Sequence, residues 1–188
     1  MKPTSPASEK GSDMTLVIDS KAKASDAGGV VQYLTFTLGG ENYGIPIERV
    51  REILEYVDPT VIPMMPSFLR GVINLRGAVV PVIDLQSRFG RVATEVAKRS
   101  CFVIVEVEHE GEAQSLGILV DAVDEVLAVE RSRIEPKPGF GTRIRSDFVD
   151  GLLNLDKHFV ITLDIRQVLS LEELASLVGV GGDGGTRA

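Results

Sequence analysis

The charged pair with the clearest chemical potential is Glu52 and Arg76. Glu52 is flanked by apolar residues, and Arg76 follows Asn74-Leu75 between two apolar runs. The planar fork of an arginine suits a carboxylate on the same chain or on a partner. Two interpretations stay open. Either Arg76 is a turn residue whose head group lies in water, or it forms a fixed ion pair with Glu52 on a binding surface.

Other residues that could support catalysis lack a suitable pattern. Asp84 and Asp164 each follow an apolar run, and we expect them to end strands and accept backbone N–H groups in the next turns. His109 and His158 lie in expected turns, without the partners of a catalytic triad or metal site. Cys101 begins an apolar run and is expected in a buried strand. The sequence thus predicts no catalytic residue, no metal site and no cofactor.

Composition excludes several classes of protein. The 188 residues carry a net charge of −7, with 5% aromatic residues and no Trp, which disfavours binding to nucleic acid. A single cysteine cannot form an internal disulfide or a multi-thiolate zinc site, and it suits a reducing cytoplasm. No uncharged apolar stretch approaches the length that spans a bilayer. We expect a cytoplasmic protein without direct membrane insertion.

The two ends of the chain differ from its middle. Residues 1–29 are rich in Ser, Lys, Asp, Ala and Gly and are expected to form a flexible tail, although residues 14–18 could dock as a short strand. Residues 179–188 are dominated by glycine and are expected to be disordered. Their GxGxxG spacing lacks the flanking strand and helix of a dinucleotide site. A domain over residues 30–178 is expected between these tails.

Short strands dominate the expected secondary structure of this domain. Apolar residues alternate over residues 34–38, and residues 79–83 and 159–163 are short β-branched runs bounded by charges. Frequent turn residues between such runs favour small barrels or a sandwich. Helical periodicity is found only over residues 47–56 and 171–177. The fold class is therefore predicted to be all-β with short helices.

The chain also repeats itself. Residues 43–54 align with residues 116–127, with five of 12 positions identical. Residues 68–85 align with residues 148–165, with six of 18 positions identical. Glu52 aligns with Glu125, whereas Arg76 aligns with Asp156. We expect two similar, intertwined all-β halves, at about 30–90 and 100–170, with a groove between them that suits binding.

Two further segments have open roles. Residues 59–69 are uncharged and contain three prolines, which oppose regular structure. Met64 and Met65 in this segment suit either a malleable contact surface or the filling of the core. Residues 131–145 contain five basic side chains, which form either a charged hairpin or a surface that steers an acidic partner.

One long motif resembles a known family. Residues 68–85, FLRGVINLRGAVVPVIDL, are similar to the signature of CheW, the bacterial chemotaxis coupling protein family. Residues 36–45, FTLGGENYGI, resemble the first strands of that family. Val50-Arg51-Glu52-Ile53 and the proline-containing loop follow in the family's order. The resemblance covers about residues 31–178, which leaves out only the tails.

This resemblance implies a fold and a function. Such proteins fold as two similar five-stranded SH3-like β-barrels packed on a shared core, with short helices at the first barrel and the C-terminus. They are adaptors without catalysis that connect the signalling tips of methyl-accepting chemotaxis receptors to the regulatory domain of the histidine kinase CheA. They are recruited to membrane-bound receptor clusters. Arg76 matches the family's functional arginine, Glu52 its charge partner, and Val50 and Ile53 apolar positions near the receptor-facing surface.

Three alternatives to this adaptor role remain. Similar adaptors serve other chemosensory pathways, such as those that control pili. A small hydrolase that uses Asp84 or Glu52 would need a pocket with a strongly perturbed carboxylate pKa. A barrel that binds single-stranded nucleic acid would show affinity that falls steeply with salt, and the acidic composition opposes it.

Overall fold

A computed structural model describes residues 16–17, 29–139, 144–170 and 172. Most of the expected flexible tails, the glycine-rich GxGxxG segment and the expected helix over residues 171–177 fall outside this described part, apart from residues 16–17, 29 and 172. In the described part, strands are joined by tight turns or longer loops, and each helix has one short turn or little more. The all-β prediction is confirmed.

The elements run in two similar series. The first contains β2 (Val30–Leu38), β3 (Glu41–Pro46), the 3-10 helix η3 (Ile47–Arg49), β4 (Val50–Glu55), β5 (Leu69–Leu75), β6 (Ala78–Asp84) and α1 (Leu85–Arg88). The second contains β7 (Cys101–His109), β8 (Glu112–Val120), β9 (Ala122–Glu130), η4 (Arg131–Arg133), β10 (Ile134–Pro136), η5 (Ser146–Phe148), β11 (Val149–Asn154), β12 (Phe159–Leu163) and α2 (Ile165–Val168). The strand β1 (Leu16–Val17) precedes both series.

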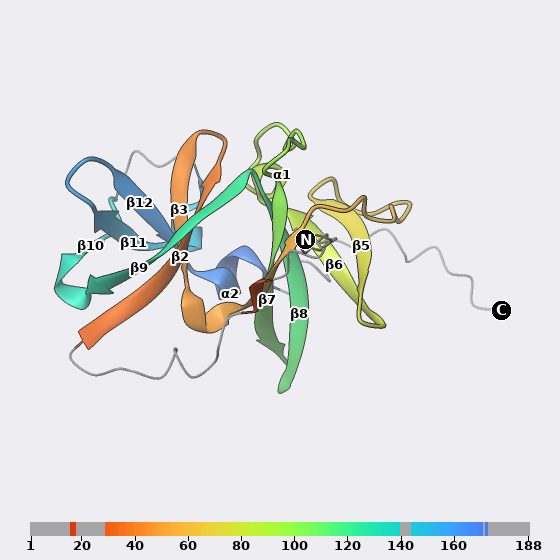
Figure 1. The fold of residues 1–188 in the computed structure, drawn as a ribbon, viewed down its shortest axis with the longest axis horizontal. Helices are drawn as coiled ribbons and strands as arrows, with labels where there is room; N and C mark the ends of the chain where they lie inside the picture. The colour runs from red at the N-terminus through yellow and green to blue at the C-terminus, as the bar shows by residue number, and fades with distance from the viewer. Residues whose placement is uncertain (1–15, 18–28, 140–143, 171, 173–188) are drawn as a thin grey trace, which may run out of the picture.

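Each sheet takes strands from both series. One sheet has the order β1-β4-β7-β8-β6-β5, and the other has the order β10-β11-β12-β3-β2-β9. We call the lobes that they form the first barrel and the second barrel; they lie side by side in Figure 1. The first two strands of each series therefore belong to the barrel of the other series. Strands from both expected halves, at about 30–90 and 100–170, are therefore found in each of the two sheets.

The pairing registers of the two barrels match the repeat. Val82 pairs with Gly117 in the first barrel, and Thr162, 80 residues after Val82, pairs with Gly44, 73 residues before Gly117. Both pairs are parallel, whereas neighbouring strands are otherwise antiparallel. Each barrel thus has five corresponding strands, and the sixth strands, β1 and β10, are short additions at sheet ends.

The structure corrects the expectation of a helix over residues 47–56. Only Ile47–Arg49 form a helical turn, and β4 follows directly. β4 pairs with β7 along its length, from Val50 opposite Val105 to Glu55 opposite Cys101. Pairing in the sheet overrides the weak helical pattern, because β-branched side chains such as Val50 and Ile53 fit a strand well.

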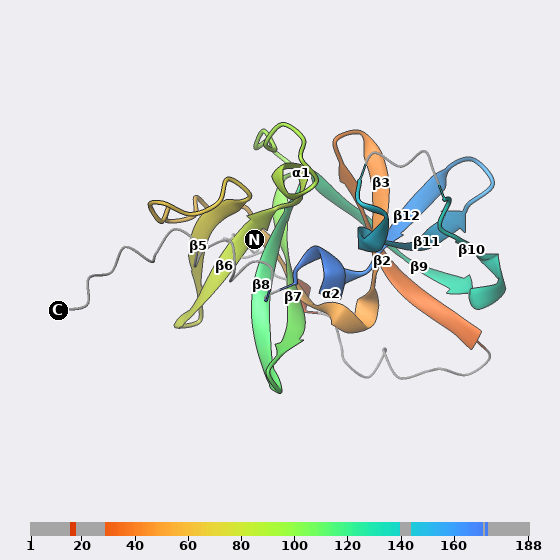
Figure 2. The ribbon, with the colours of Figure 1, turned by 180° about the vertical axis from the view of Figure 1, so that it is seen from behind.

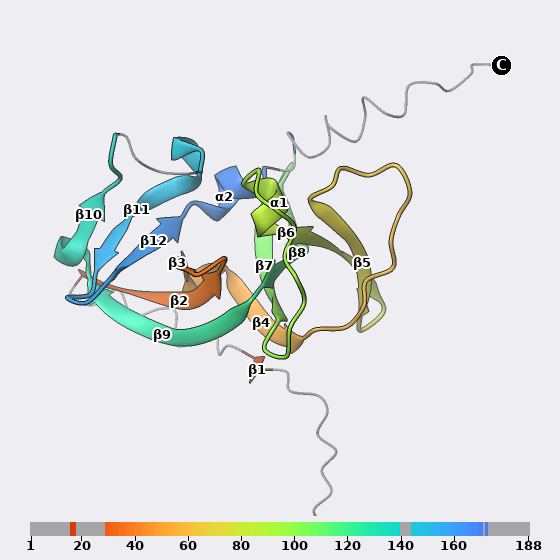
Figure 3. The same ribbon diagram turned by 90° about the horizontal axis from the view of Figure 1, so that it is seen from above.

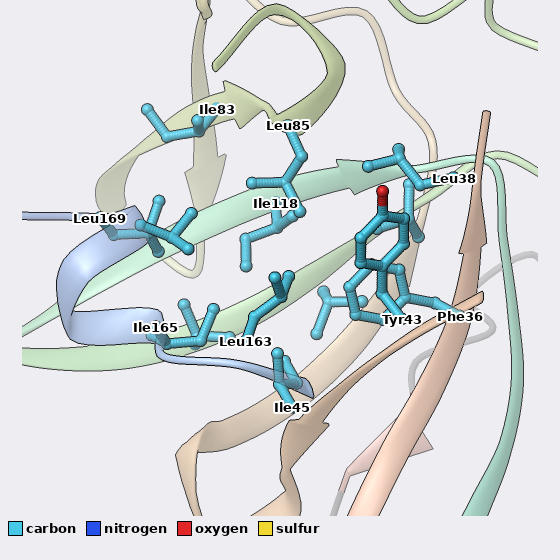
Figure 4. Close-up of a cluster of buried hydrophobic side chains, with 14 of the residues drawn as sticks. Phe36, Leu38, Tyr43, Ile45, Ile83, Leu85, Ile118, Leu163, Ile165 and Leu169 are labelled. Carbon is cyan, nitrogen blue, oxygen red and sulfur yellow. The ribbon is translucent and has the colours of Figure 1, made fainter. Parts of the chain in front are cut away.

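A shared core joins the barrels. Its buried side chains come from both sheets and both helices, as Figure 4 shows: Phe36, Leu38, Tyr43, Ile45, Ile83, Leu85, Ile118, Leu163, Ile165 and Leu169. Helix α2 lies between the two lobes (Figure 2). The Arg88 guanidinium stacks 5.3 Å from the ring of Phe68 and 4.8 Å from the ring of Phe148, which are equivalent residues of the two series. Each barrel also has its own smaller apolar cluster.

Candidate binding surface

A bulge in β4 positions Glu52. The register between β4 and β7 shifts between Val50 and Glu52, so that Glu52 lies opposite Ile104. Ile104 belongs to the apolar cluster of the first barrel, which Leu54 also contacts. Glu52 is 6% exposed. A nearly buried carboxylate needs a charged or hydrogen-bonding partner to offset the cost of its desolvation.

Arg76 supplies that partner from a tight turn. Leu75 pairs with Ala78, so Arg76 and Gly77 are the two central residues of the hairpin between β5 and β6. Both have positive φ, 52° and 88°, as this type of two-residue hairpin requires. The Gly77 N–H donates to Oδ1 of Asn74 at 2.9 Å. The turn thereby fixes the direction in which the arginine leaves the hairpin.

The ion pair between Arg76 and Glu52 is bidentate. Nη1 donates to Oε1 at 2.7 Å, and Nη2 donates to Oε2 at 2.6 Å. The Arg76 side chain is 62% exposed, whereas that of Glu52 is 7% exposed. Hydrogen bonding to Glu52 raises the pKa of the Arg76 guanidinium, so the group stays charged. The ion pair with Glu52 therefore forms, and Arg76 is at the same time an exposed turn residue. That the pair lies on a binding surface stays a prediction.

This ion pair also closes the first barrel. Strand β4 and the β5–β6 hairpin lie near opposite ends of the sheet, separated by β7 and β8. The contact between Glu52 and Arg76 connects those ends beside the barrel's apolar cluster. We call this end of the first barrel its mouth.

Among the described residues, the second barrel has no such pair at its equivalent mouth. Asp156 also has a positive φ, at 64°, and its N–H donates to Oδ1 of Asn154. Its carboxylate lies 3.5 Å from the guanidinium of Arg133, and Glu125 is exposed. A pocket of about 240 Å³ occupies this mouth and is lined by Thr35, Asn42, Asp124, Glu125, Leu127, Leu155, His158 and Val160.

The two apolar residues assigned to the receptor-facing surface are placed differently. Val50 is fully buried in the shared core. Its side chain therefore lies beneath the surface, and its place near a receptor-facing surface stays a prediction. Ile53 is partly buried and packs on the edge of the same core. The burial of these two side chains follows from the bulge at Arg51, because the bulge places Val50 and Ile53 on the side of β4 that faces the core.

Exposed apolar residues near the first barrel were not singled out from the sequence as a group. They lie in the β4–β5 connection and at the start of β6: Val57 (54% exposed), Val61 (72%), Met64 (88%) and Val79 (70%). The exposure of Met64 favours a contact surface over filling of the core. The uncharged composition of residues 59–69 was the available signal, but it did not distinguish a surface loop from a buried one.

The aspartates at the strand ends are helix caps. Asp84 is fully buried and accepts hydrogen bonds from the backbone of Gln86 and Ser87 and from both the N–H and the hydroxyl of Thr94. Asp164 accepts from the backbone N–H of Arg166 at 3.0 Å. These bonds satisfy orphan N–H groups at the start of α1 and α2. The expectation of turn-capping aspartates is confirmed.

The remaining candidates have ordinary surroundings. Burial raises the pKa of the Cys101 thiol to about 11, which keeps the thiol protonated near neutral pH. In the basic segment, Arg145 pairs with Asp147 at 2.6 Å, and Lys137 donates to the carbonyl of Ser146. Within the described residues, no three His, Cys, Asp or Glu side chains form a group that could hold a metal ion. None of the described helices has the length and apolar character needed to cross a membrane.

Known proteins share this sequence and this fold. A family model described as CheW-like domain matches residues 32–173. The chemotaxis protein CheW of Klebsiella aerogenes is 36% identical over 144 residues, which cover 77% of this chain and 84% of that protein. The chemotaxis protein CheW of Treponema pallidum is 35% identical over 153 residues, covering 79% and 88% of the two chains.

A solved structure and a shorter match complete the comparison. The crystal structure of the scaffolding protein TtCheW from Thermoanaerobacter tengcongensis superposes with a TM-score of 0.67 and 38% sequence identity. It covers 73% of this chain and 91% of that protein. Protein FrzA of Myxococcus xanthus is 38% identical over 65 residues, which cover 35% of this chain.

Proposed function

The chain belongs to the CheW-like domain family, and from this premise we propose that it is a chemotaxis adaptor that couples chemoreceptors to a CheA-type histidine kinase. The names of its relatives, chemotaxis protein and scaffolding protein, support this role. The adaptor acts without catalysis: Asp84 is saturated by capping hydrogen bonds, and Glu52 is held by Arg76. Its place of action is the cytoplasmic side of membrane-bound receptor clusters, and its domain spans residues 30–178.

The observation that carries this proposal at the level of the site is the ion pair between Glu52 and Arg76. An arginine held in a bidentate pair is preorganised, so that little conformational entropy is lost when a partner binds it. Its guanidinium remains 62% exposed and presents unused donors. We assign Arg76 to direct contact with the signalling tip of a methyl-accepting receptor or with the kinase regulatory domain. Glu52 positions it, Ile53 adds apolar surface, and Val50 supports β4 from the core.

Reconstitution tests the proposal. The full chain is mixed with a receptor signalling-tip fragment and a CheA-type kinase from the same organism, and kinase autophosphorylation is followed with and without it. We expect a large rise in autophosphorylation, which Arg76→Ala reduces by about tenfold or more, the scale of a binding hot spot. Asp156→Ala, at the equivalent turn position of the second barrel, is the matched control and should retain the rise.

Each result has a distinct meaning. A folded Arg76→Ala variant with undiminished coupling would contradict the assignment of the site but leave the adaptor role intact. Failure of the full chain to bind either partner would contradict the chemotaxis role. Receptor–kinase pairs from other chemosensory pathways, such as those that control pili, are the next partners to test. Circular dichroism of each variant separates loss of contact from loss of fold.

A further inference from the structure

A short strand from the N-terminal region covers the outer edge of β4. In β1, Leu16 pairs antiparallel with Ile53, and Val17 pairs with Glu52. Figure 3 shows β1 beside β4 at the end of the first sheet. An edge strand presents unpaired N–H and C=O groups that readily accept another strand. β1 therefore covers the edge of β4 beside Glu52, which would otherwise be open to a partner.

The fold itself does not require this cover. β9 is the strand equivalent to β4, since it follows β8 as β4 follows β3, and it lies at the end of its own sheet. Among the described residues, no strand pairs with the outer edge of β9. β1 also lies before the family match, which begins at residue 32. The additional strand is thus an attachment to a complete barrel, present at one of two equivalent edges.

The attachment lies at the backbone of Glu52, the residue that holds Arg76. We propose that residues 16–17 form an intramolecular strap that excludes a receptor segment from the edge of β4 and thereby lowers the affinity of the Glu52–Arg76 surface for receptor. This inference rests on the proposed adaptor function. It adds a built-in competitor to that function, supplied by the chain itself.

The pairing of β1 with β4 is weak enough for a partner to displace it. Among the described residues, two on each strand are paired, and an isolated two-stranded pairing is marginally stable in water. The chain from Val17 to the start of β2 at Val30 is short, so that the strap is tethered near β4 at an effective concentration of roughly millimolar order. Together these features give a contact that forms readily and that a partner can replace.

Three forms of the chain test the proposal. Deletion of residues 1–28 removes the strap, and Val17→Pro removes one backbone N–H and restricts the pairing. Ala22→Pro places the same residue outside the paired segment and is the matched control. Hydrogen exchange of the β4 amides reports the pairing directly. Titration with a receptor signalling-tip fragment reports its effect on affinity.

We expect faster exchange in β4 for the deletion and for Val17→Pro, with unchanged exchange for Ala22→Pro. The same two forms should bind the receptor fragment about threefold to tenfold more tightly, since a larger fraction of the protein is competent to bind. Equal affinities for all forms, with clear binding by each, would overturn the strap and leave the adaptor function in place. Absence of binding by every form would overturn both.

Discussion

The two barrels share their topology, pairing registers and bulges, but they differ at the mouth. In the first barrel, a nearly buried glutamate and an arginine from the β5–β6 turn close the mouth. In the second, the equivalent turn carries Asp156, and a pocket of about 240 Å³ remains. The backbone of both turns is in the same left-handed conformation. The two mouths thus differ in the side chain at a turn position that has a positive φ in both barrels.

The largest difference between the barrels in the effect of a substitution on stability is expected at the equivalent bulge glycines, Gly71 and Gly151. Gly71 has φ of +143°, and an added Cβ would overlap the backbone carbonyl of Thr60. Gly71→Ala should therefore lower the free energy of unfolding by about 3 kcal/mol or more. Gly151→Ala should cost less, because its Cβ would meet Glu135, at 2.8 Å, in the short edge strand β10. Chemical denaturation measures both, and equal losses would contradict the difference.

The next largest difference in the effect of substitutions on stability is expected at Val82 and Thr162, which are equivalent and fully buried. The hydroxyl of Thr162 has no hydrogen-bond partner among the described residues. Val82→Thr should lower the free energy of unfolding by about 1–3 kcal/mol, the cost of a buried polar group without a partner. Thr162→Val should leave it unchanged or raise it, since the hydroxyl is replaced by a methyl group of similar size. Thermal unfolding of both variants provides the measurement, and a destabilised Thr162→Val would reveal a bond that the hydroxyl makes.

Glu52 and Glu125 test the mouth itself. Glu52→Ala removes a charge-assisted double hydrogen bond and should lower the free energy of unfolding by about 1–2 kcal/mol, with the value limited by the exposure of Arg76 to solvent. Glu125→Ala, at the open mouth, should change it by less than about 0.5 kcal/mol. Urea denaturation at two salt concentrations measures both. A Glu52→Ala protein as stable as Glu125→Ala would mean that the ion pair does not stabilise the barrel.

The smallest effect of a substitution on the free energy of unfolding at neutral pH is expected at Cys101 in the first barrel. Its pKa is raised to about 11 by burial, whereas an unfolded thiol titrates near roughly 8.5. The protonated thiol therefore contributes stability that is fully present below about pH 8.5 and is lost as pH rises toward 11. Alkylation of the native protein at pH 8 should be slow, and Cys101→Ser should remove the alkaline part of the pH dependence. Rapid alkylation at pH 8 would contradict the raised pKa.

Local patterns predicted much of this molecule. The internal repeat anticipated two similar barrels, and apolar runs that end in aspartate anticipated capped strand ends at Asp84 and Asp164. The pairing of Glu52 with Arg76 was one of two open interpretations. It could be proposed because a carboxylate among apolar residues needs a partner.

The features that depend on long-range pairing were not predictable. Intertwined halves were expected, but which strands are exchanged, β2–β3 and β7–β8, leaves no mark on the repeat, since either pairing satisfies the same apolar pattern. The apparent helix over residues 47–56 became β4 because its partner, β7, begins more than forty residues later in the sequence. The burial of Val50 depends on a bulge that only this pairing creates.

The exchange of strands has a consequence for the origin and assembly of the fold. Each series of strands is unable to complete a barrel by itself, because two of its strands belong to the other barrel. Two copies of one series, placed face to face, would instead complete two barrels with twofold symmetry. This is the architecture that duplication and fusion of a strand-exchanged homodimer would produce. The segment between α1 and β7 connects the two series. Cleavage of this segment should leave two fragments that stay folded only when they are bound to each other.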